Sequence, residues 1–144
     1  MFVTHFNVIN DWTVEDHNVA HHSDLTLLND TVRKIEREDA QREIMVFTHH
    51  SPTILDVASD QAHKESEVSS AFVTDLSMER WWMSPLMKVS AWGHAHFNCD
   101  FRDPKTGKRC IVNQEEYGIS EKFEFDRSTV VSISGTIPLP TTKE

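Results

Sequence analysis

The chain has 144 residues, enough for one domain with a buried core, and we expect residues 1–144 to form a single domain. Its 23 acidic and 14 basic side chains give a formal net charge of -9, which argues against nucleic acid held by its phosphate backbone. No apolar run approaches the ~20 residues that span a bilayer, and the first residues lack the pattern of a signal peptide.

These features predict a cytoplasmic protein with no membrane partner. Cys99 and Cys110 are the only two cysteines and show no CxxC spacing, so a reducing compartment is the simpler interpretation. The two thiols are still able to face each other across a hairpin.

The first strong periodicity in the chain is helical. Over residues 23–39, apolar side chains recur at alternating steps of three and four, which predicts a helix with Ser23 as its N-cap and one apolar face: Leu25, Leu28, Val32 and Ile35. Asp24 would then oppose the positive end of the helix dipole. The preceding histidines are interpreted as solvated residues ahead of the helix: His17, His21 and His22.

Two short apolar runs each end on histidines. Residues 43–48, EIMVFT, predict a strand buried on both faces that stops at the sequence HHSP. Residues 88–92, KVSAW, predict a second strand that stops at GHAH. Gly93 lacks a Cβ and is expected to let the backbone turn tightly there.

The segment between these two strands is predicted to contain a surface loop, a helix break and part of the core. Residues 53–70 are polar and without periodicity, which predicts a surface loop and the least ordered internal stretch. Pro85 should end any helix before it. Three tryptophans in apolar company are interpreted as core: Trp81, Trp82 and Trp92.

The C-terminal third predicts antiparallel strands. The turn signal PKTG between residues 97–103 and 108–113 indicates a hairpin, and residues 122–134 predict another strand pair around Asp126-Arg127. Residues 1–9 and 135–144 are expected to be frayed.

Histidines at two neighbouring strand ends are typical of a metal site, because loops at strand ends carry function on a rigid frame. If the two junctions lie side by side, His49, His94 and His96 converge on a metal ion. Neutral imidazole suits Zn, Fe, Mn, Ni or Cu, so the ligand type leaves the ion open. His50 either faces a substrate or packs beside its neighbour.

The two histidine motifs resemble those of the calcineurin-like metallophosphoesterase superfamily. VFTHHSP is similar to that family's strand-then-His motif, and WGHAHFN is similar to its Gly-His-x-His motif. The resemblance extends to DWTVEDHNVAHHSDLTLLN and GKRCIVNQEEYG and covers most of residues 10–133. It implies an α/β fold, specifically part of a four-layer α-β-β-α sandwich with a mixed sheet and a C-terminal hairpin.

The same resemblance implies a function and a set of site residues. The family hydrolyses phosphate esters with water activated at two divalent metal ions, which would be Zn, Fe or Mn here. Carried onto this chain, the motifs make His49 and His94 ligands of one ion and His96 a ligand of the other. They suggest His50 as a catalytic residue that positions the phosphate or the leaving group. Two residues are expected near a phosphate-ester substrate: Asn113 and Tyr117.

The chain also departs from the family pattern. The family's Asp-x-His, Gly-Asp-x-x-Asp and Gly-Asn-His motifs have no counterpart, because the first glycine is Gly93 and no histidine follows an aspartate by two positions. We therefore expect the C-terminal portion of such a domain, with binding of metal easier than hydrolysis. The alternative is a non-catalytic remnant that binds metal or pairs with another chain. An incomplete sheet would also favour self-association through its exposed surface.

Overall fold

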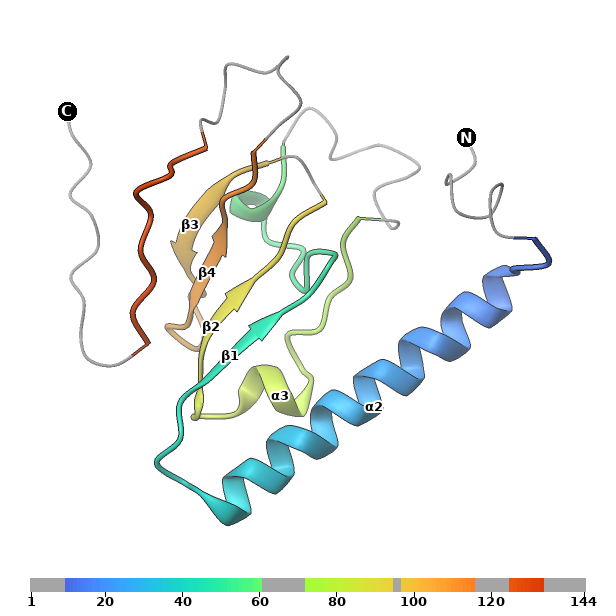
Figure 1. Ribbon diagram of the computed structural model, residues 1–144, viewed down its shortest axis with the longest axis horizontal. Coiled ribbons are helices and arrows are strands. Elements are labelled where there is room, and N and C mark those ends of the chain that lie inside the picture. Colours follow the sequence, from blue (N-terminus) through green and yellow to red (C-terminus); the bar gives the residue numbers. More distant parts are fainter. Residues whose placement is uncertain (1–9, 61–71, 95–96, 116–124, 134–144) are drawn as a thin grey trace.

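The computed structural model describes residues 10–60, 72–94, 97–115 and 125–133. These residues form a mixed α/β fold in which one four-stranded sheet packs against a long helix and a short one (Figure 1). The expected α/β class and the mixed sheet are confirmed. The described helices include none that is long and apolar enough to cross a membrane.

The sheet places three strand ends at one edge. The strand order is β1-β2-β4-β3, where β1 pairs parallel with β2, β2 pairs parallel with β4, and β3 pairs antiparallel with β4. The strands span Ile44–Phe47 (β1), Met87–Ala91 (β2), Cys99–Arg102 (β3) and Arg109–Val112 (β4). Because β1, β2 and β4 run in the same direction, the loops that follow them begin at the same edge of the sheet.

The β3–β4 hairpin confirms the turn signal PKTG. Asp103 accepts hydrogen bonds from the backbone N–H and the hydroxyl of Thr106, and Gly107 adopts a φ of 72°. In this register Cys99 lies opposite Val112 and not opposite Cys110. The two free thiols are therefore diagonal neighbours, farther apart than the ~3.5–4.5 Å between Cβ atoms that a disulfide requires.

The long helix begins earlier than the periodicity indicated. Helix α2 spans Val14–Glu38, and Thr13 is its N-cap in a capping box with Asp16. The hydroxyl of Thr13 accepts from the backbone N–H of Asp16 at 3.1 Å, and the Asp16 carboxylate accepts from the backbone N–H of Thr13 at 3.0 Å. The prediction of Ser23 as N-cap is therefore wrong.

This earlier start changes the interpretation of several polar residues. The three histidines expected ahead of the helix lie within it: His17, His21 and His22. Asp24 lies in the third turn, too far from the helix N-terminus for the dipole interaction that we assigned to it, which fades within the first turn. The apolar stripe itself was predicted correctly, since Val32 is fully buried and Leu25 and Leu28 pack against the core.

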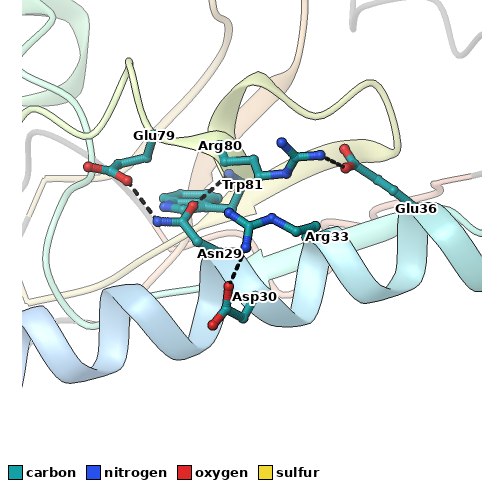
Figure 2. Close-up of polar contacts among 7 residues, drawn as sticks. All are labelled: Asn29, Asp30, Arg33, Glu36, Glu79, Arg80 and Trp81. Carbon is teal, nitrogen blue, oxygen red and sulfur yellow. Dashed lines mark hydrogen bonds and ion pairs between the residues drawn. The ribbon is translucent and has the colours of Figure 1, made fainter.

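Helix α3 (Arg80–Met83) is joined to α2 by polar contacts (Figure 2). The Asn29 side chain accepts from the backbone N–H of Trp81 at 3.0 Å and donates to the Glu79 carboxylate at 2.8 Å. Arg80 donates to the Glu36 carboxylate at 2.7 Å. The helix ends before Pro85, as expected from the missing N–H of proline.

The core lies between the sheet and the two helices. The three tryptophans expected there are confirmed as core, with relative exposures of 0% for Trp81, 1% for Trp82 and 6% for Trp92. They pack with buried residues from α2 and from three strands: Val32, Val46, Met87, Cys110 and Val112. In β1 only Val46 is buried and Phe47 is 74% exposed, so the prediction that this strand is buried on both faces is wrong.

Two other expectations meet the structure only in part. Residues 53–60 are more structured than a polar loop, because the 3-10 helix Asp56–Ala58 inserts Ala58 into the core. Within residues 125–133 the chain turns near Arg127 and forms no strand, so the expected strand pair is wrong for that segment. Residues 61–71 and both expected frayed ends, 1–9 and 135–144, lie outside the described residues.

Candidate metal centre

Two histidines leave the C-terminal end of β1. The backbone N–H of Thr48 donates to the carbonyl of Ala91 at 3.0 Å, which continues the pairing with β2 for one residue. The Thr48 hydroxyl then donates to the carbonyl of His50 at 2.7 Å and holds the turn. As a result His49 and His50 are fixed at the edge of the sheet, with His49 exposed and His50 half-buried.

His94 reaches the same edge from the next strand. Gly93 follows β2 by two residues, and its N–H donates to the carbonyl of His49 at 3.3 Å. The left-handed residue in this turn is His94, which has a φ of 62°. Gly93 instead permits close approach, because a Cβ there would lie 3.3 Å from the side-chain oxygen of Gln114.

Positive φ at His94 is an uncommon conformation for a residue with a Cβ. It costs about 1–2 kcal/mol, although histidine adopts it more often than most residues do. Such strain persists where surrounding contacts fix the residue, and it is concentrated at functional sites. The twist aims the His94 ring at the loop after β1.

The three imidazoles meet. Ring centroids are 4.5 Å apart for His49 and His94, 4.7 Å for His49 and His50, and 4.8 Å for His50 and His94. One ring nitrogen from each lies within 4.8 Å of the other two. Among the described residues this is the single group of three or more potential ligand side chains close enough to hold one ion.

An aromatic ring and a short parallel pairing support this group. Phe72 stacks on His94 with 5.0 Å between centroids and an interplanar angle of 20°. Ser51, directly after the two histidines, donates its N–H to the Phe72 carbonyl at 3.0 Å and accepts from the Thr74 N–H at 2.9 Å. The segment carrying Phe72 therefore holds both the His94 ring and the loop after β1.

The structure thus brings His49 and His94 together and adds His50 to them. His96 and Tyr117, expected as a ligand and a substrate neighbour, lie outside the described residues. Asn113 follows β4, and its side chain both accepts from the backbone N–H of Asp126 at 3.0 Å and donates to its carbonyl at 2.8 Å. These two bonds join the segment after β4 to the backbone of Asp126. The role of Asn113 near a substrate stays a prediction.

The donor set fits a borderline divalent ion. Two nitrogen ligands on a tetrahedral zinc ion with Zn–N bonds of about 2.0–2.1 Å lie about 3.3 Å apart. The ring nitrogens, which lie within 4.8 Å of one another, would therefore move closer together on binding one ion. Three neutral imidazoles bring no negative charge, so a bound ion would keep its full positive charge toward a further ligand. Such a site would favour an anionic oxygen ligand.

No protein-family model, no curated protein and no solved structure matches this chain. The three converging histidines are therefore the feature on which a functional argument rests.

The sequence pattern did not identify two members of this arrangement. The sequence places His50 either at a substrate or packed beside its neighbour, whereas the structure brings its ring close to those of His49 and His94. Phe72 had no motif, and its position against His94 depends on the pairing of Ser51 with Val73. The one signal for Phe72 in the sequence is that it is an aromatic residue at the end of the polar segment that follows HHSP.

Proposed function

We propose that this chain binds a divalent metal ion through His49, His50 and His94 and serves phosphate-ester hydrolysis at that centre. The observation that carries the proposal is the convergence of three imidazoles from two neighbouring parallel strands. Clustered ligands at the carboxyl ends of parallel strands are where α/β folds place their binding sites.

The resemblance of the two histidine motifs to calcineurin-like metallophosphoesterases supports the phosphate-ester assignment. Under this proposal, the sheet and helices form part of the family's four-layer sandwich, and the family's second ion would be held by His96. A bound divalent ion would supply positive charge to phosphoryl oxygens and would acidify a coordinated water.

The residues of this chain would hold and orient that centre. His49 is the most exposed of the three, and the turn after β1 holds its backbone. His94 is fixed by its backbone and by the stacked Phe72 ring. The sequence suggests that His50 positions the phosphate or the leaving group. Its ring lies 4.7 Å from that of His49 and 4.8 Å from that of His94, so we assign it as the third ligand.

Metal binding and hydrolysis can be tested separately. Calorimetric titration of the full chain with Zn²⁺ or Mn²⁺ should show a site that His94→Ala weakens at least roughly tenfold, since loss of even an outer-shell partner costs that much. His22→Ala, an exposed histidine on α2, is the matched control and should not affect that site. Equal affinities of the His94→Ala variant and the wild type would contradict the assignment.

Hydrolysis is measured with aryl phosphate mono- and diesters at saturating Mn²⁺ or Zn²⁺. Any turnover should depend on the ion and be abolished by His49→Ala or His94→Ala. If the chain alone binds metal but does not turn over, a second polypeptide carrying the Asp-x-His, Gly-Asp-x-x-Asp and Gly-Asn-His motifs should restore it. Metal binding without turnover in either setting would leave a metal-binding protein and remove the phosphoesterase assignment.

A second candidate, pairing with another chain, is favoured by one observation. Phe47 is 74% exposed at the end of β1, the first strand in the order of the described sheet. Exposed aromatic side chains on an edge strand favour association with another strand. Sedimentation of the wild type should then reveal a dimer that Phe47→Lys dissociates, while Val130→Lys, also exposed, does not.

A further inference from the structure

A pair of histidines lies one helical turn apart on α2, away from the centre described above. His17 and His21 both belong to the helix Val14–Glu38, at spacing i, i+4. Side chains at this spacing lie on the same face of a helix, with Cβ atoms about 5–6 Å apart. The Cα of His22, the next residue, is displaced by about 100° around the helix, although its ring lies 5.7 Å from the His21 ring, centroid to centroid.

The pair continues the inner face of the helix. His17 and His21 are half-buried, as are Leu25 and Leu28 one and two turns farther on, whereas His22 is exposed. On this face of α2, leucines occupy the positions that pack on the core, and histidines occupy the corresponding positions near the beginning of the helix. In Figure 1 these first turns, drawn in blue, extend away from the labelled strands. Packing against the sheet therefore does not explain why the face continues with histidine.

The helix around the pair is fixed at both ends. Immediately before it, the capping box of Thr13 and Asp16 orders the first turn. Farther along, Asn29 joins the helix to α3. A chelating pair on a helix that is already formed loses little additional backbone entropy when an ion binds. The backbone that carries the two imidazoles is thus in place before an ion binds.

We propose that His17 and His21 form a second transition-metal site, separate from the strand-end histidines. Two histidines at i, i+4 on one helix face are a known means of holding a divalent ion such as Zn²⁺. Imidazole donors select Cu²⁺, Ni²⁺ and Zn²⁺ over Mg²⁺ or Ca²⁺, and the general order of affinities places Cu²⁺ first. Asp24, three residues after His21, and the net charge of -9 add attraction for a cation.

The test uses the full chain in a His49→Ala/His94→Ala background, which removes the strand-end site. Titration with Cu²⁺, followed by calorimetry and by the electron paramagnetic resonance of the bound ion, should show one equivalent with nitrogen ligands. His17→Ala or His21→Ala should weaken this binding at least roughly tenfold. His22→Ala removes a ring that contacts His21 but keeps the i, i+4 pair, so it should weaken the binding less than either of those two variants.

The His21→Ala variant contains its own spacing control. It retains His17 and His22, but five residues separate them, and their side chains diverge by about 140° around the helix. If the number of histidines mattered and not their placement, this variant would bind as well as His22→Ala. Equal binding by the two variants, or no binding in the starting background, would overturn the proposal.

Loss of helix is separated from loss of ligands by a second pair of variants. His17→Gln and His21→Gln keep a polar side chain of similar length, and far-ultraviolet circular dichroism reports whether α2 remains intact. An intact helix with lost Cu²⁺ binding supports the site. An intact helix with unchanged binding in both glutamine variants overturns it. In the variants that bind, Cu²⁺ should also raise the melting temperature, because the i, i+4 pair is brought together only in the folded helix.

Discussion

The Asn29 side chain on α2 caps α3 across the interface, accepting the backbone N–H of Trp81 at 3.0 Å. Its amide also donates to the Glu79 carboxylate at 2.8 Å, so one side chain satisfies two groups at the beginning of α3 (Figure 2). Trp81 is fully buried and is one of the largest fully buried side chains of the core. The Asn29 side chain therefore satisfies the backbone of a core residue across the interface between α2 and α3.

Asn29→Ala should lower the free energy of unfolding by about 1–3 kcal/mol, because it removes a cap and leaves a buried N–H without its acceptor. Chemical denaturation of both proteins measures the difference. Asn18→Ala is the matched control, since Asn18 is exposed on the same helix and should change stability by less than about 0.5 kcal/mol. Helix propensity favours alanine over asparagine at both positions, so a loss for Asn29→Ala no larger than that for Asn18→Ala would show that the contact with Trp81 does not stabilise the fold.

Glu36 should make stability depend on pH. Hydrogen bonds from the side chains of Ser84 and then Arg80 lower the pKa of the Glu36 carboxyl below its usual value. A group with a lowered pKa in the folded state stabilises the protein above its unfolded-state pKa, and this contribution is lost as pH falls through the folded-state pKa. Between about pH 5 and pH 3, therefore, the wild type should lose stability more steeply than Glu36→Gln.

The control for this pH dependence is Glu38→Gln. The Glu38 side chain is 64% exposed and lies 4.0 Å from Lys34, a surface pair of the kind that contributes little. Denaturant midpoints measured across this pH window should follow the wild type for Glu38→Gln and flatten for Glu36→Gln. Parallel curves for all three proteins would rule out a role for the Glu36 contacts in acid stability.

Substitutions at His94 should separate strain from metal binding. With a chelator present, His94→Gly should be more stable than His94→Ala by about 1 kcal/mol, because glycine tolerates the φ of 62° and alanine does not. Both variants should lose the strand-end metal site equally. If the two variants melt at the same temperature, the left-handed conformation at His94 is not a source of strain.

Both cysteines should be unreactive in the folded protein. Burial raises the pKa of the Cys99 thiol and of the Cys110 thiol to about 12, so almost no thiolate exists near pH 8. A chromogenic disulfide reagent should label them slowly in buffer and rapidly in denaturant, and Cys99→Ser then assigns the remaining signal to Cys110. Rapid labelling of the native protein would show that the β3–β4 hairpin opens readily.

Local patterns in the sequence determined most of the elements. The runs EIMVFT and KVSAW, the turn PKTG and the break at Pro85 predicted β1, β2, the hairpin and the end of α3, because each depends on the residues within it. The start of α2 also depends on local residues, the capping box from Thr13 to Asp16. The prediction of Ser23 as N-cap followed the start of the apolar stripe and missed this box. The resemblance of the two histidine motifs likewise rests on sequence alone.

The tertiary structure decided which histidines meet. Parallel pairing of β1 with β2 brings His49 and His94 to one edge, and this much followed from the motifs. The inclusion of His50 and the stacking of Phe72 did not follow, because side-chain directions after a strand depend on turns that distant segments fix. The left-handed backbone at His94 is of the same kind: no local preference requires it, and contacts from two other parts of the chain hold it in place.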